Sequence, residues 1–208
     1  PYEFYNKIIA YVILNYKLKH NDKRVHIIFD HMFSKDNFTV FMITMRVGKQ
    51  GIPLWFRCFE DKDDPEAFAE EIIKEGITHV SNLFNGRFDL IFLADRWFNS
   101  TGIMEHINFL GHTYALRLKK NLKVLHQGKK DKEKVWKSLS DLSKYKFHKD
   151  YSYRFGGIET VFKNQKSDGF YIEDTVNCSL KYFQSMYYFS CIGVLLLTIM
   201  GASFAKNT

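Results

Sequence analysis

Three acidic residues stand in sequence contexts that suit metal-dependent chemistry. Asp30 lies in RVHIIFDHMF, Asp95 in DLIFLADRWF and Glu159 in YSYRFGGIETVFKNQKS. Each aspartate ends an apolar run that is typical of a buried strand, and the glutamate begins a helix-like segment. Carboxylates are hard oxygen ligands for Mg²⁺, and two such ions about 3.5–4 Å apart can clamp a phosphodiester during in-line displacement. The pattern favours DNA-strand chemistry, provided that folding brings the three carboxylates together.

Cations accompany the glutamate. Glu159, Lys163 and Lys166 follow helical spacing, so they share one face of the predicted helix. That face would present a carboxylate to a metal ion and two ammonium groups to phosphates. An ordinary solvent-exposed ion-pair face is the alternative that the spacing leaves open.

For three further residues near these motifs, a structural role and a functional role are both conceivable. His31, beside Asp30, is expected to pack or to form a hydrogen bond rather than to bind metal. Trp97 and Trp136 are expected to pack in the core or on the surface, and stacking on an unpaired DNA base is the second interpretation.

The net charge of +7 is unevenly distributed. Residues 117–149 hold twelve Lys or Arg against three acidic residues, whereas residues 60–75 hold eight acidic residues against two Lys. Neutralising phosphates releases counterions, so the basic block predicts DNA contacts, and a solvated lysine-rich loop is the alternative. We expect phosphate contacts from Lys119, Lys120 and Lys123, and we expect the acidic segment 65–75 to face away from DNA.

The composition excludes several classes of protein. The chain has 208 residues, 46% of them hydrophobic, which is enough to bury a substantial core. Cys58, Cys178 and Cys191 form no CxxC pair, which indicates reduced thiols in a cytoplasmic protein rather than a disulfide scaffold. No secretory signal is recognisable, and residues 1–24 are expected to be a linker helix or the end of a longer N-terminal region.

The hydrophobic patterns predict an α/β fold. We expect strands at 25–30, 37–47, 51–60, 88–95 and 112–118. We expect helices at 3–18, from Asp64 and Pro65 onward with Asp64 as N-cap, at 99–109, around Glu159 and at about 175–204. This order predicts a mixed sheet with helices on both faces, and ligands in such sheets collect beyond the carboxyl ends of strands. Residues 119–150 show only weak patterning.

The C-terminal segment leaves a membrane protein as an alternative. Residues 187–205 carry no charge, and their length approaches what a bilayer span requires. Their hydrophobicity is moderate, and several hydroxyl side chains interrupt the segment. We therefore expect a core helix that packs on the sheet or on a partner subunit, and no membrane.

These motifs together resemble the DDE transposases of bacterial insertion sequences. The elements of the resemblance are Asp30 in IIFD, Asp95 in LADRWF and a Tyr–Arg–Glu–Lys series over 151–166. The branch named after the fourth insertion sequence carries a similar Y-x2-R-x3-E-x6-K pattern. The resemblance spans about residues 25–204. It implies a ribonuclease H-like mixed sheet flanked by helices, with a first core part at 25–118, a short basic insertion at 119–150 and a helical part at 151–208.

The resemblance also implies an activity and a site. The family cleaves and transfers DNA strands with two Mg²⁺ or Mn²⁺ ions, so Asp30, Asp95 and Glu159 would be the catalytic metal ligands. Tyr151, Arg154 and Lys166 would contact DNA phosphates. The expected partner is DNA at element ends and at the target, with a homodimer possible and no small-molecule substrate. A simple nuclease of the same fold and a non-catalytic DNA-binding remnant are the alternatives.

The sequence departs from the branch pattern in two places. Four residues separate Arg154 from Glu159, where the pattern has three, and the additional residue falls at Gly156-Gly157. Glycine can absorb it in a turn before the helix, but Tyr151 and Arg154 are then less firmly assigned than the three carboxylates. The segment 119–150 is also short beside the large β-rich insertion common in this branch.

Overall fold

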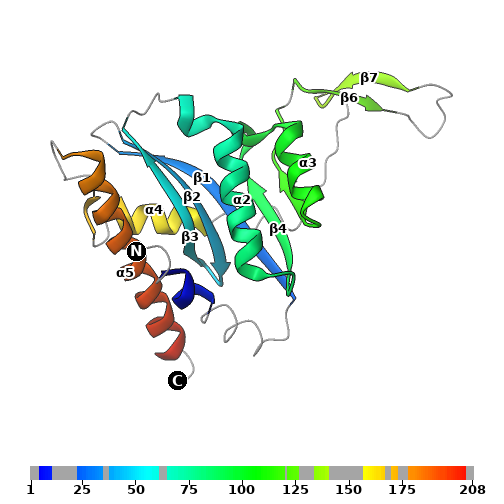
Figure 1. Ribbon diagram of the computed structural model, residues 1–208. Coiled ribbons are helices and arrows are strands. Elements are labelled where there is room, and N and C mark those ends of the chain that lie inside the picture. The colour runs from blue at the N-terminus through cyan, green and yellow to red at the C-terminus, as the bar shows by residue number, and fades with distance from the viewer. Residues whose placement is uncertain are drawn as a thin grey trace.

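The computed structural model of the chain describes residues 5–10, 23–34, 38–60, 65–119, 121–126, 134–140, 157–166, 170–172 and 178–204. Figure 1 shows a twisted central sheet with helices in front of and behind it, and a small separate hairpin that projects from this body. Residues 5–10 form a short helical segment, of which Tyr5 and Ile9 are buried.

Five strands form the main sheet in the order β3-β2-β1-β4-β5. Their bounds are β1 Arg24–Phe33, β2 Thr39–Val47, β3 Gln50–Phe59, β4 Asp89–Ala94 and β5 Thr113–Leu116. The β1–β2 and β2–β3 pairs are antiparallel, whereas β1–β4 and β4–β5 are parallel. The central strands are rich in Val, Ile and Phe because both of their faces are buried. The predicted mixed sheet is confirmed.

A tight turn joins β2 to β3. Gly48 adopts a left-handed conformation with φ of 61°, which a glycine tolerates without strain. The pairing shifts register between Ile43 and Thr44 of β2, where β3 carries one additional residue, Leu54. β1, β2 and β3 thus form an antiparallel meander, and β4 and β5 form the parallel half of the sheet.

Helices cover both faces of the sheet, as predicted. The helices η1 Pro65–Phe68, α2 Glu70–Phe84, η2 Arg96–Phe98 and α3 Thr101–Phe109 follow the meander and β4. The helices α4 Ile158–Lys166 and α5 Leu180–Phe204 follow later in the chain. A Cβ atom added to Gly76 of α2 would lie 2.8 Å from Ile43 and 2.9 Å from Trp55, so α2 packs tightly on one face. In Figure 1, α2 lies in front of the sheet and α4 behind it.

The second face belongs to α4 and α5. The Phe56 ring of β3 lies 5.0 Å from the Tyr187 ring of α5. Gln165 of α4 accepts a hydrogen bond from the Tyr187 hydroxyl at 2.7 Å and donates to Ser190 at 3.1 Å. These groups are buried, so the polar cluster joins the two helices over the sheet. It satisfies groups that would otherwise be costly to bury.

An aromatic cluster fills the core between the sheet and the other helices. The ring centroid of Phe29 lies 4.8 Å from that of Phe98, 6.2 Å from Phe41 and 6.4 Å from Phe92. These side chains are at most 2% exposed. Edge-to-face packing of this kind contributes beyond simple area burial, and it fixes the turn after β4 against β1.

The structure corrects three predicted element boundaries. The helix expected from Pro65 is interrupted: η1 ends at Phe68, Ala69 is extended with ψ of 134°, and α2 begins at Glu70. Strand β1 continues three residues past Asp30, because His31, Met32 and Phe33 still pair with β2. Helix α5 begins at Leu180 rather than near residue 175, and residues 178 and 179 before it are not helical. The proposed N-cap Asp64 lies outside the described residues.

The segment expected to be a weakly patterned linker contains a hairpin. Strand β6 Lys123–His126 pairs antiparallel with β7 Val135–Ser138 in a separate two-stranded sheet. Each strand has only four residues and mixes Lys with apolar side chains, so it produces little periodic signal. Figure 1 shows this hairpin extending away from the main sheet.

The cysteines agree with the reduced state expected from the sequence. Cys58, Cys178 and Cys191 are free thiols, and Cys58 and Cys191 are buried. Burial raises the pKa of both buried thiols. They therefore stay protonated at neutral pH and act as small core side chains.

Candidate active site

Asp30 and Asp95 occupy matching positions on neighbouring parallel strands. In the β1–β4 pair, Ile28 lies opposite Leu93. Each aspartate lies two residues further along its strand, so the same register places them side by side. β4 itself ends at Ala94, but Asp95 keeps an extended backbone with φ of −79° and ψ of 174°. Neighbouring strands lie about 4.8 Å apart, so the two carboxylates start from adjacent backbone positions.

Both aspartates face the layer of α4 and α5. Residues directly opposite each other in an antiparallel pair point to the same face. Asp30 lies opposite Met42, and Met42 lies opposite Phe56, which packs on Tyr187 of α5. Asp95 follows β4 with an extended backbone, so the alternation of that strand, continued from Leu93, puts it on the same face. Both aspartates are partly exposed, as a ligand-binding carboxylate must be.

A local hydrogen bond orients each carboxylate. The backbone N–H of His31 donates to Oδ1 of Asp30 at 2.9 Å, and the backbone N–H of Arg96 donates to Oδ1 of Asp95 at 2.6 Å. Asp95 thereby also caps the short helix η2. The two aspartates thus share one local geometry at one edge of the sheet, and that geometry is set before any ligand binds.

Arg117 extends the set of polar residues beside Asp30 and Asp95 to β5, the third parallel strand. In the β4–β5 pair, Ala94 lies opposite Leu116, and the N–H of Arg117 donates to the carbonyl of Ala94 at 3.3 Å. The register continued by one residue therefore places Arg117 beside Asp95. Arg96 follows Asp95 directly. The edge of the sheet carries two carboxylates suited to a hard cation and two guanidinium groups suited to phosphate oxygens.

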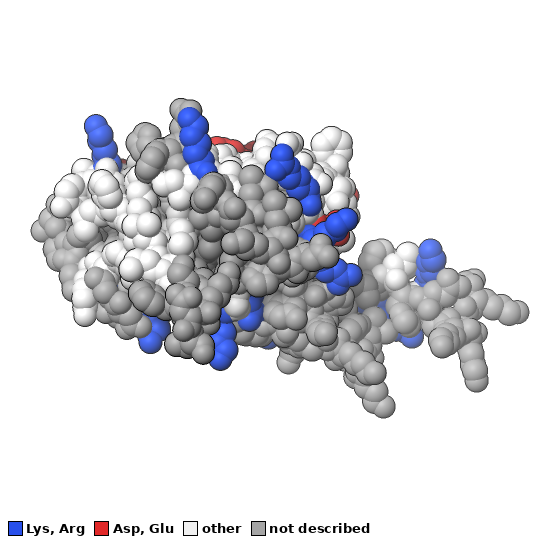
Figure 2. Space-filling view, turned by 90° about the horizontal axis from the view of Figure 1, so that it is seen from below, with Lys and Arg blue, Asp and Glu red and all other residues white. Residues whose placement is uncertain are grey.

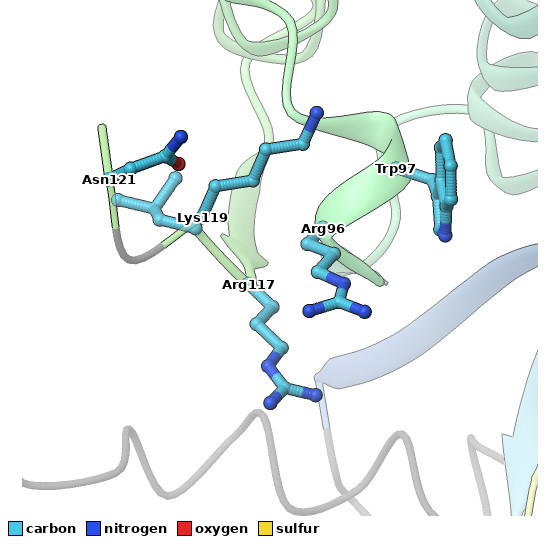
Figure 3. A pocket seen from close by; sticks show the side chains of 6 residues that line it. Arg96, Trp97, Arg117, Lys119 and Asn121 are labelled. Atoms are coloured by element: carbon cyan, nitrogen blue, oxygen red, sulfur yellow. The ribbon is translucent and has the colours of Figure 1, made fainter.

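A cavity of about 570 Å³ is lined in part by Arg96, the residue that follows Asp95. Figure 3 shows its wall, with the side chains of Arg96 and Arg117 pointing to the same side and Trp97 flanking Arg96. Leu118, Lys119 and Asn121 complete the lining. The ammonium group of Lys119 lies 5.7 Å from the centre of the Trp97 ring. The cavity therefore combines cations with an aromatic surface, a pairing typical of sites for nucleic acid strands.

Helix α4 places Lys166, rather than Glu159, at the end of β1. The Lys166 ammonium group donates to the carbonyl of Phe33 at 2.9 Å, three residues past Asp30. The other end of α4 lies at the β2–β3 turn, where the Thr160 hydroxyl is 3.5 Å from the carbonyl of Lys49. Glu159 is exposed in that first turn.

The arrangement of carboxylates bears on metal binding. Asp30 and Asp95 fit a hard divalent cation, because two aligned carboxylates repel each other and a cation relieves that repulsion. Within the described ranges, no group of three or more His, Cys, Asp or Glu side chains lies close enough to hold a metal ion. The β1–β4 register, continued past its last pair, thus places the two aspartates level with each other, and Glu159 forms no three-membered ligand group with them.

The other residues that the sequence predicted for DNA binding are either outside the described residues or on other elements. Tyr151, Arg154 and Lys120 lie outside the described residues. Lys123 begins strand β6 of the projecting hairpin, and Lys163 is exposed in the last turn of α4.

Among the described residues, the paired acidic side chains around α2 lie on a different face of the sheet from Asp30 and Asp95. Arg57 bridges Glu66 at 3.2 Å and Glu75 at 3.1 Å, and Lys74 pairs with Glu70 at 2.5 Å, so three acidic residues in and before α2 have cationic partners. These pairs lie on the face opposite to the one that Asp30 and Asp95 share. Figure 2, seen from below, shows described Lys and Arg side chains spread along the molecule with few Asp or Glu among them.

His31 has a structural role on the opposite face from Asp30. Its ring stacks on Phe98 at 5.0 Å, and its Nε2 lies 2.8 Å from the carbonyl of Ala67, to which it donates. Burial lowers the pKa of His31 below its ordinary value of 6.5, and the hydrogen bond to Ala67 opposes this shift in part. The expected packing role is confirmed.

Sequence reasoning missed Arg96, Trp97 and Arg117 as a group. Arg96 and Trp97 stand in the recognised LADRWF motif, but Arg117 ends the run HTYALRL with no local pattern that marks it. Only the parallel register of β4 and β5 brings it to the site.

Comparison with known proteins gives one finding. A family model described as "Transposase DDE domain" matches residues 19–179 of this chain. The matched segment contains the whole five-stranded sheet, both aspartates, the cavity beside Asp95 and helix α4. No curated protein and no solved structure matches the chain.

Proposed function

Because the chain belongs to the DDE transposase family, we propose that it cleaves DNA strands at the ends of an insertion sequence and transfers them to a target. We further propose that its mixed sheet is a ribonuclease H-like core and that it stands in the branch named after the fourth insertion sequence. The observation that carries the proposal is the parallel β1–β4 register, which, continued two residues past the Ile28–Leu93 pair, places Asp30 level with Asp95.

In this proposal each group has a distinct task. Asp30 and Asp95 would hold Mg²⁺ or Mn²⁺, as two ions, and bound ions of this kind polarise a phosphoryl group and activate the attacking oxygen. Arg96 and Arg117 would bind the phosphate oxygens beside them, because guanidinium groups pair bidentately with phosphate. They would position the scissile phosphodiester against the carboxylates and offset its charge.

Glu159 is proposed as the third metal ligand. Its place in the family pattern supports this role, and its position in the first turn of α4 requires that the helix shift toward the aspartates when metal and DNA bind. Lys163 and Lys166 would then follow the DNA backbone on the same helix. Tyr151 and Arg154 are proposed to contact phosphates on the ground of the resemblance alone.

The proposed partner is DNA, and binding is expected to be largely electrostatic. Lys119, Lys120 and Lys123 would contribute phosphate contacts, so affinity should fall steeply as salt concentration rises. A cytoplasmic location and a homodimer accompany the proposal as expectations.

The deciding experiment is metal-dependent nicking of supercoiled DNA by the full chain. Nicking is expected with Mg²⁺ or Mn²⁺ and not with EDTA. Asp30→Asn and Asp95→Asn should each remove it, because each keeps the side-chain shape and loses the charge. Glu105→Gln, which changes an exposed carboxylate of α3, should retain it. Activity that survives Asp30→Asn would refute the proposed site.

A non-catalytic DNA-binding remnant is the second candidate. The separation of Glu159 from the two aspartates favours it, since a site with two carboxylates lacks the third ligand that the family pattern contains. DNA binding by the wild-type chain without any nicking would select the remnant. Nicking without joining of a labelled DNA end to a target would select a simple nuclease.

A further inference from the structure

Phe98 anchors the turn after β4 on the face of the sheet opposite to the aspartates. It is 2% exposed, whereas Trp97 beside it is 78% exposed. The Phe98 ring centroid lies 4.8 Å from that of Phe29 and 5.0 Å from that of His31. Phe29 and His31 are the two chain neighbours of Asp30, and the alternation of β1 turns them to the opposite face from Asp30. One ring therefore contacts the residues on both sides of Asp30.

The same residue is tied to Asp95. The backbone N–H of Phe98 donates to the carbonyl of Asp95 at 3.1 Å. The backbone N–H of Arg96 donates to the Asp95 side chain at 2.6 Å, which fixes the carboxylate on the same turn. Because these two hydrogen bonds close the turn, a displacement of the Phe98 ring would carry Asp95 with it.

The contacts of Phe98 begin where the pairing of the strands ends. The last pair of the β1–β4 ladder is Ile28 with Leu93, two residues before each aspartate. In the described part of these two strands, no β1–β4 ladder pair includes Asp30 or Asp95. The packing of Phe98 on the neighbours of Asp30 therefore joins the two aspartate segments beyond the last ladder pair.

His31 is held from its other side by η1. Its ring is stacked on Phe98 with an interplanar angle of 7°. Its Nε2 donates to the carbonyl of Ala67 at 2.8 Å, and the Phe68 ring lies 4.6 Å away. The ring thus has support from both directions. Close-packed groups of this kind transmit a displacement instead of absorbing it.

We propose that Phe98 and His31 are positioning residues that fix the spacing of Asp30 and Asp95, so that the site prefers Mg²⁺ to Ca²⁺. The inference rests on the proposed function, in which these two carboxylates hold the metal ions. Phe98 and His31 contact neither metal nor DNA in this account, and they act through the aspartates alone.

A fixed spacing selects between the two ions because their coordination differs. Mg²⁺ requires a near-ideal octahedron of oxygen atoms at about 2.0–2.1 Å, whereas Ca²⁺ accepts six to eight oxygen atoms at about 2.3–2.6 Å in variable geometry. A carboxylate pair held at one spacing can match the tight shell of Mg²⁺ but cannot open for the wider shell of Ca²⁺. Loss of the ring stack should therefore weaken Mg²⁺ binding more than Ca²⁺ binding.

The test measures metal binding by the full chain without DNA. Electron paramagnetic resonance counts bound Mn²⁺, and Mg²⁺ or Ca²⁺ then displaces it in separate titrations that give the dissociation constant of each ion. Wild type should bind Mg²⁺ more tightly than Ca²⁺. Phe98→Leu and His31→Leu each remove one flat ring and should weaken Mg²⁺ binding by roughly 10-fold, as loss of a group that supports a metal ligand commonly does. Their Ca²⁺ affinity should change by less than about 2-fold, because Ca²⁺ tolerates a looser site.

Two variants separate positioning from a general loss of stability. His31→Phe keeps a flat ring against Phe98 and loses the hydrogen bond to Ala67, so it should retain the preference for Mg²⁺. Phe84→Leu removes a buried ring, 2% exposed, at the end of α2. Phe84 packs on Phe88, just before the start of β4, whereas Asp95 follows the end of that strand. This variant should lower stability in urea and leave the ratio of the two dissociation constants unchanged.

An unchanged ratio in both Phe98→Leu and His31→Leu would overturn the inference, and so would an equal change of the ratio in Phe84→Leu. Failure of the proposed function gives a different result. A wild-type chain that binds no Mn²⁺ refutes the metal site and the inference together. A chain that binds Mn²⁺ and nicks DNA, with an unchanged ratio in the two leucine variants, refutes the positioning role alone. The expected ratios without nicking would support the positioning role and refute the transposase activity.

Discussion

Continued past its last pair, Ile28 and Leu93, the parallel β1–β4 register brings Asp30 level with Asp95, which lies 65 positions later in the sequence. The strand order places β4 directly beside β1 with no strand between them. Two negative charges on neighbouring strand ends repel, and the repulsion falls when a divalent cation binds between them. A metal ion bound there, as proposed, would therefore stabilise this edge of the sheet.

The first prediction concerns this linkage. Mg²⁺ or Mn²⁺ should raise the melting temperature of wild type, because a ligand that binds only the folded state stabilises it. Asp30→Asn and Asp95→Asn should lose this rise, and without metal each should be at least as stable as wild type. Differential scanning calorimetry with and without metal measures both effects.

Glu105→Gln is the control, since Glu105 is an exposed carboxylate on α3. It should keep the full metal-induced rise. An equal rise in wild type and Asp30→Asn would place the metal elsewhere.

The positions of Asp30 and Asp95 at this edge of the sheet could be predicted from the sequence, because the signal lies in the residues next to each aspartate. Asp30 and Asp95 each follow an apolar run, and a strand end is where such a sheet collects ligands. Arg117 could not be predicted, because its place depends on the β4–β5 register and not on its neighbours in sequence. The hairpin β6–β7 was missed because two four-residue strands carry too little periodic signal.

The position of Glu159 was also beyond sequence reasoning. Its spacing from Lys163 and Lys166 predicted the helix correctly. Where that helix lies is decided by contacts far apart in sequence, namely Gly51 against Gly157 and Gln165 against α5. Spacing on one helix carries no information about such contacts.

The second prediction tests the contact that positions α4. A Cβ atom at Gly51 would lie 2.8 Å from the carbonyl oxygen of Gly157 and 2.8 Å from Val161. Gly51→Ala should therefore push the first turn of α4 away from β3 and destabilise the protein by about 1–3 kcal/mol, as overpacking commonly does. Urea unfolding followed by circular dichroism measures the loss.

Gly201→Ala provides the matched control. A Cβ atom there meets nothing within 4 Å, and the residue lies in helix α5. Alanine should leave stability unchanged or increase it by up to about 1 kcal/mol, because glycine is a poor helix former. Equal stability of Gly51→Ala and wild type would show that α4 is not held closely at β3.

The third prediction concerns the buried hydrogen bonds between α4 and α5. Tyr187 donates to Gln165 at 2.7 Å, Gln165 donates to Ser190 at 3.1 Å, and Ser190 donates to the carbonyl of Tyr187 at 2.7 Å. Tyr187→Phe and Gln165→Leu each leave a buried polar group without its partner, so each should cost about 1–3 kcal/mol. Urea unfolding of both single variants and the double variant forms a double-mutant cycle.

The double variant should cost less than the two single costs combined, because it removes both partners of one hydrogen bond. Tyr182→Phe, at a tyrosine of α5 that is 57% exposed, should have almost no effect. Strict additivity of the two buried changes would mean that Tyr187 and Gln165 act independently.

The fourth prediction is a dependence of stability on pH. Burial lowers the pKa of His31, and it also lowers the pKa of His79 and His112, so the folded state resists protonation at these rings. As pH falls below about 6.5, the unfolded chain takes up protons that the folded chain does not. The free energy of unfolding should therefore decrease between pH 7.5 and pH 5, as urea unfolding at each pH would measure.

His31→Gln isolates one part of this dependence. Glutamine can still donate a hydrogen bond to Ala67 but does not titrate, so the decrease between pH 7.5 and 5 should become smaller. The decrease in unfolding free energy that persists in His31→Gln should come from His79 and His112. A decrease of equal size in wild type and in His31→Gln would remove His31 from the explanation.

The fifth prediction addresses helix α5. Among the described residues, one helix is long and apolar enough to cross a membrane, Leu180–Gly201, and 33% of its most apolar window is buried inside the protein. Phe183, Tyr187 and Val194 pack inward, whereas Phe189 and Leu197 are 69% and 62% exposed. We expect this helix to remain packed on the sheet, because moving it into lipid would break the buried hydrogen bonds to Gln165.

Fractionation of cells that express the chain, followed by an alkaline wash, checks this expectation. Wild type should be absent from the washed membrane pellet. Leu197→Glu places a charge on the exposed face of α5, so a packed helix should tolerate it and the soluble yield should increase. In a membrane span the same charge would cost about 2.5–3.5 kcal/mol near the centre and would reduce insertion. Wild-type protein that resists the wash, is released by detergent and loses membrane recovery on Leu197→Glu would establish α5 as a membrane span.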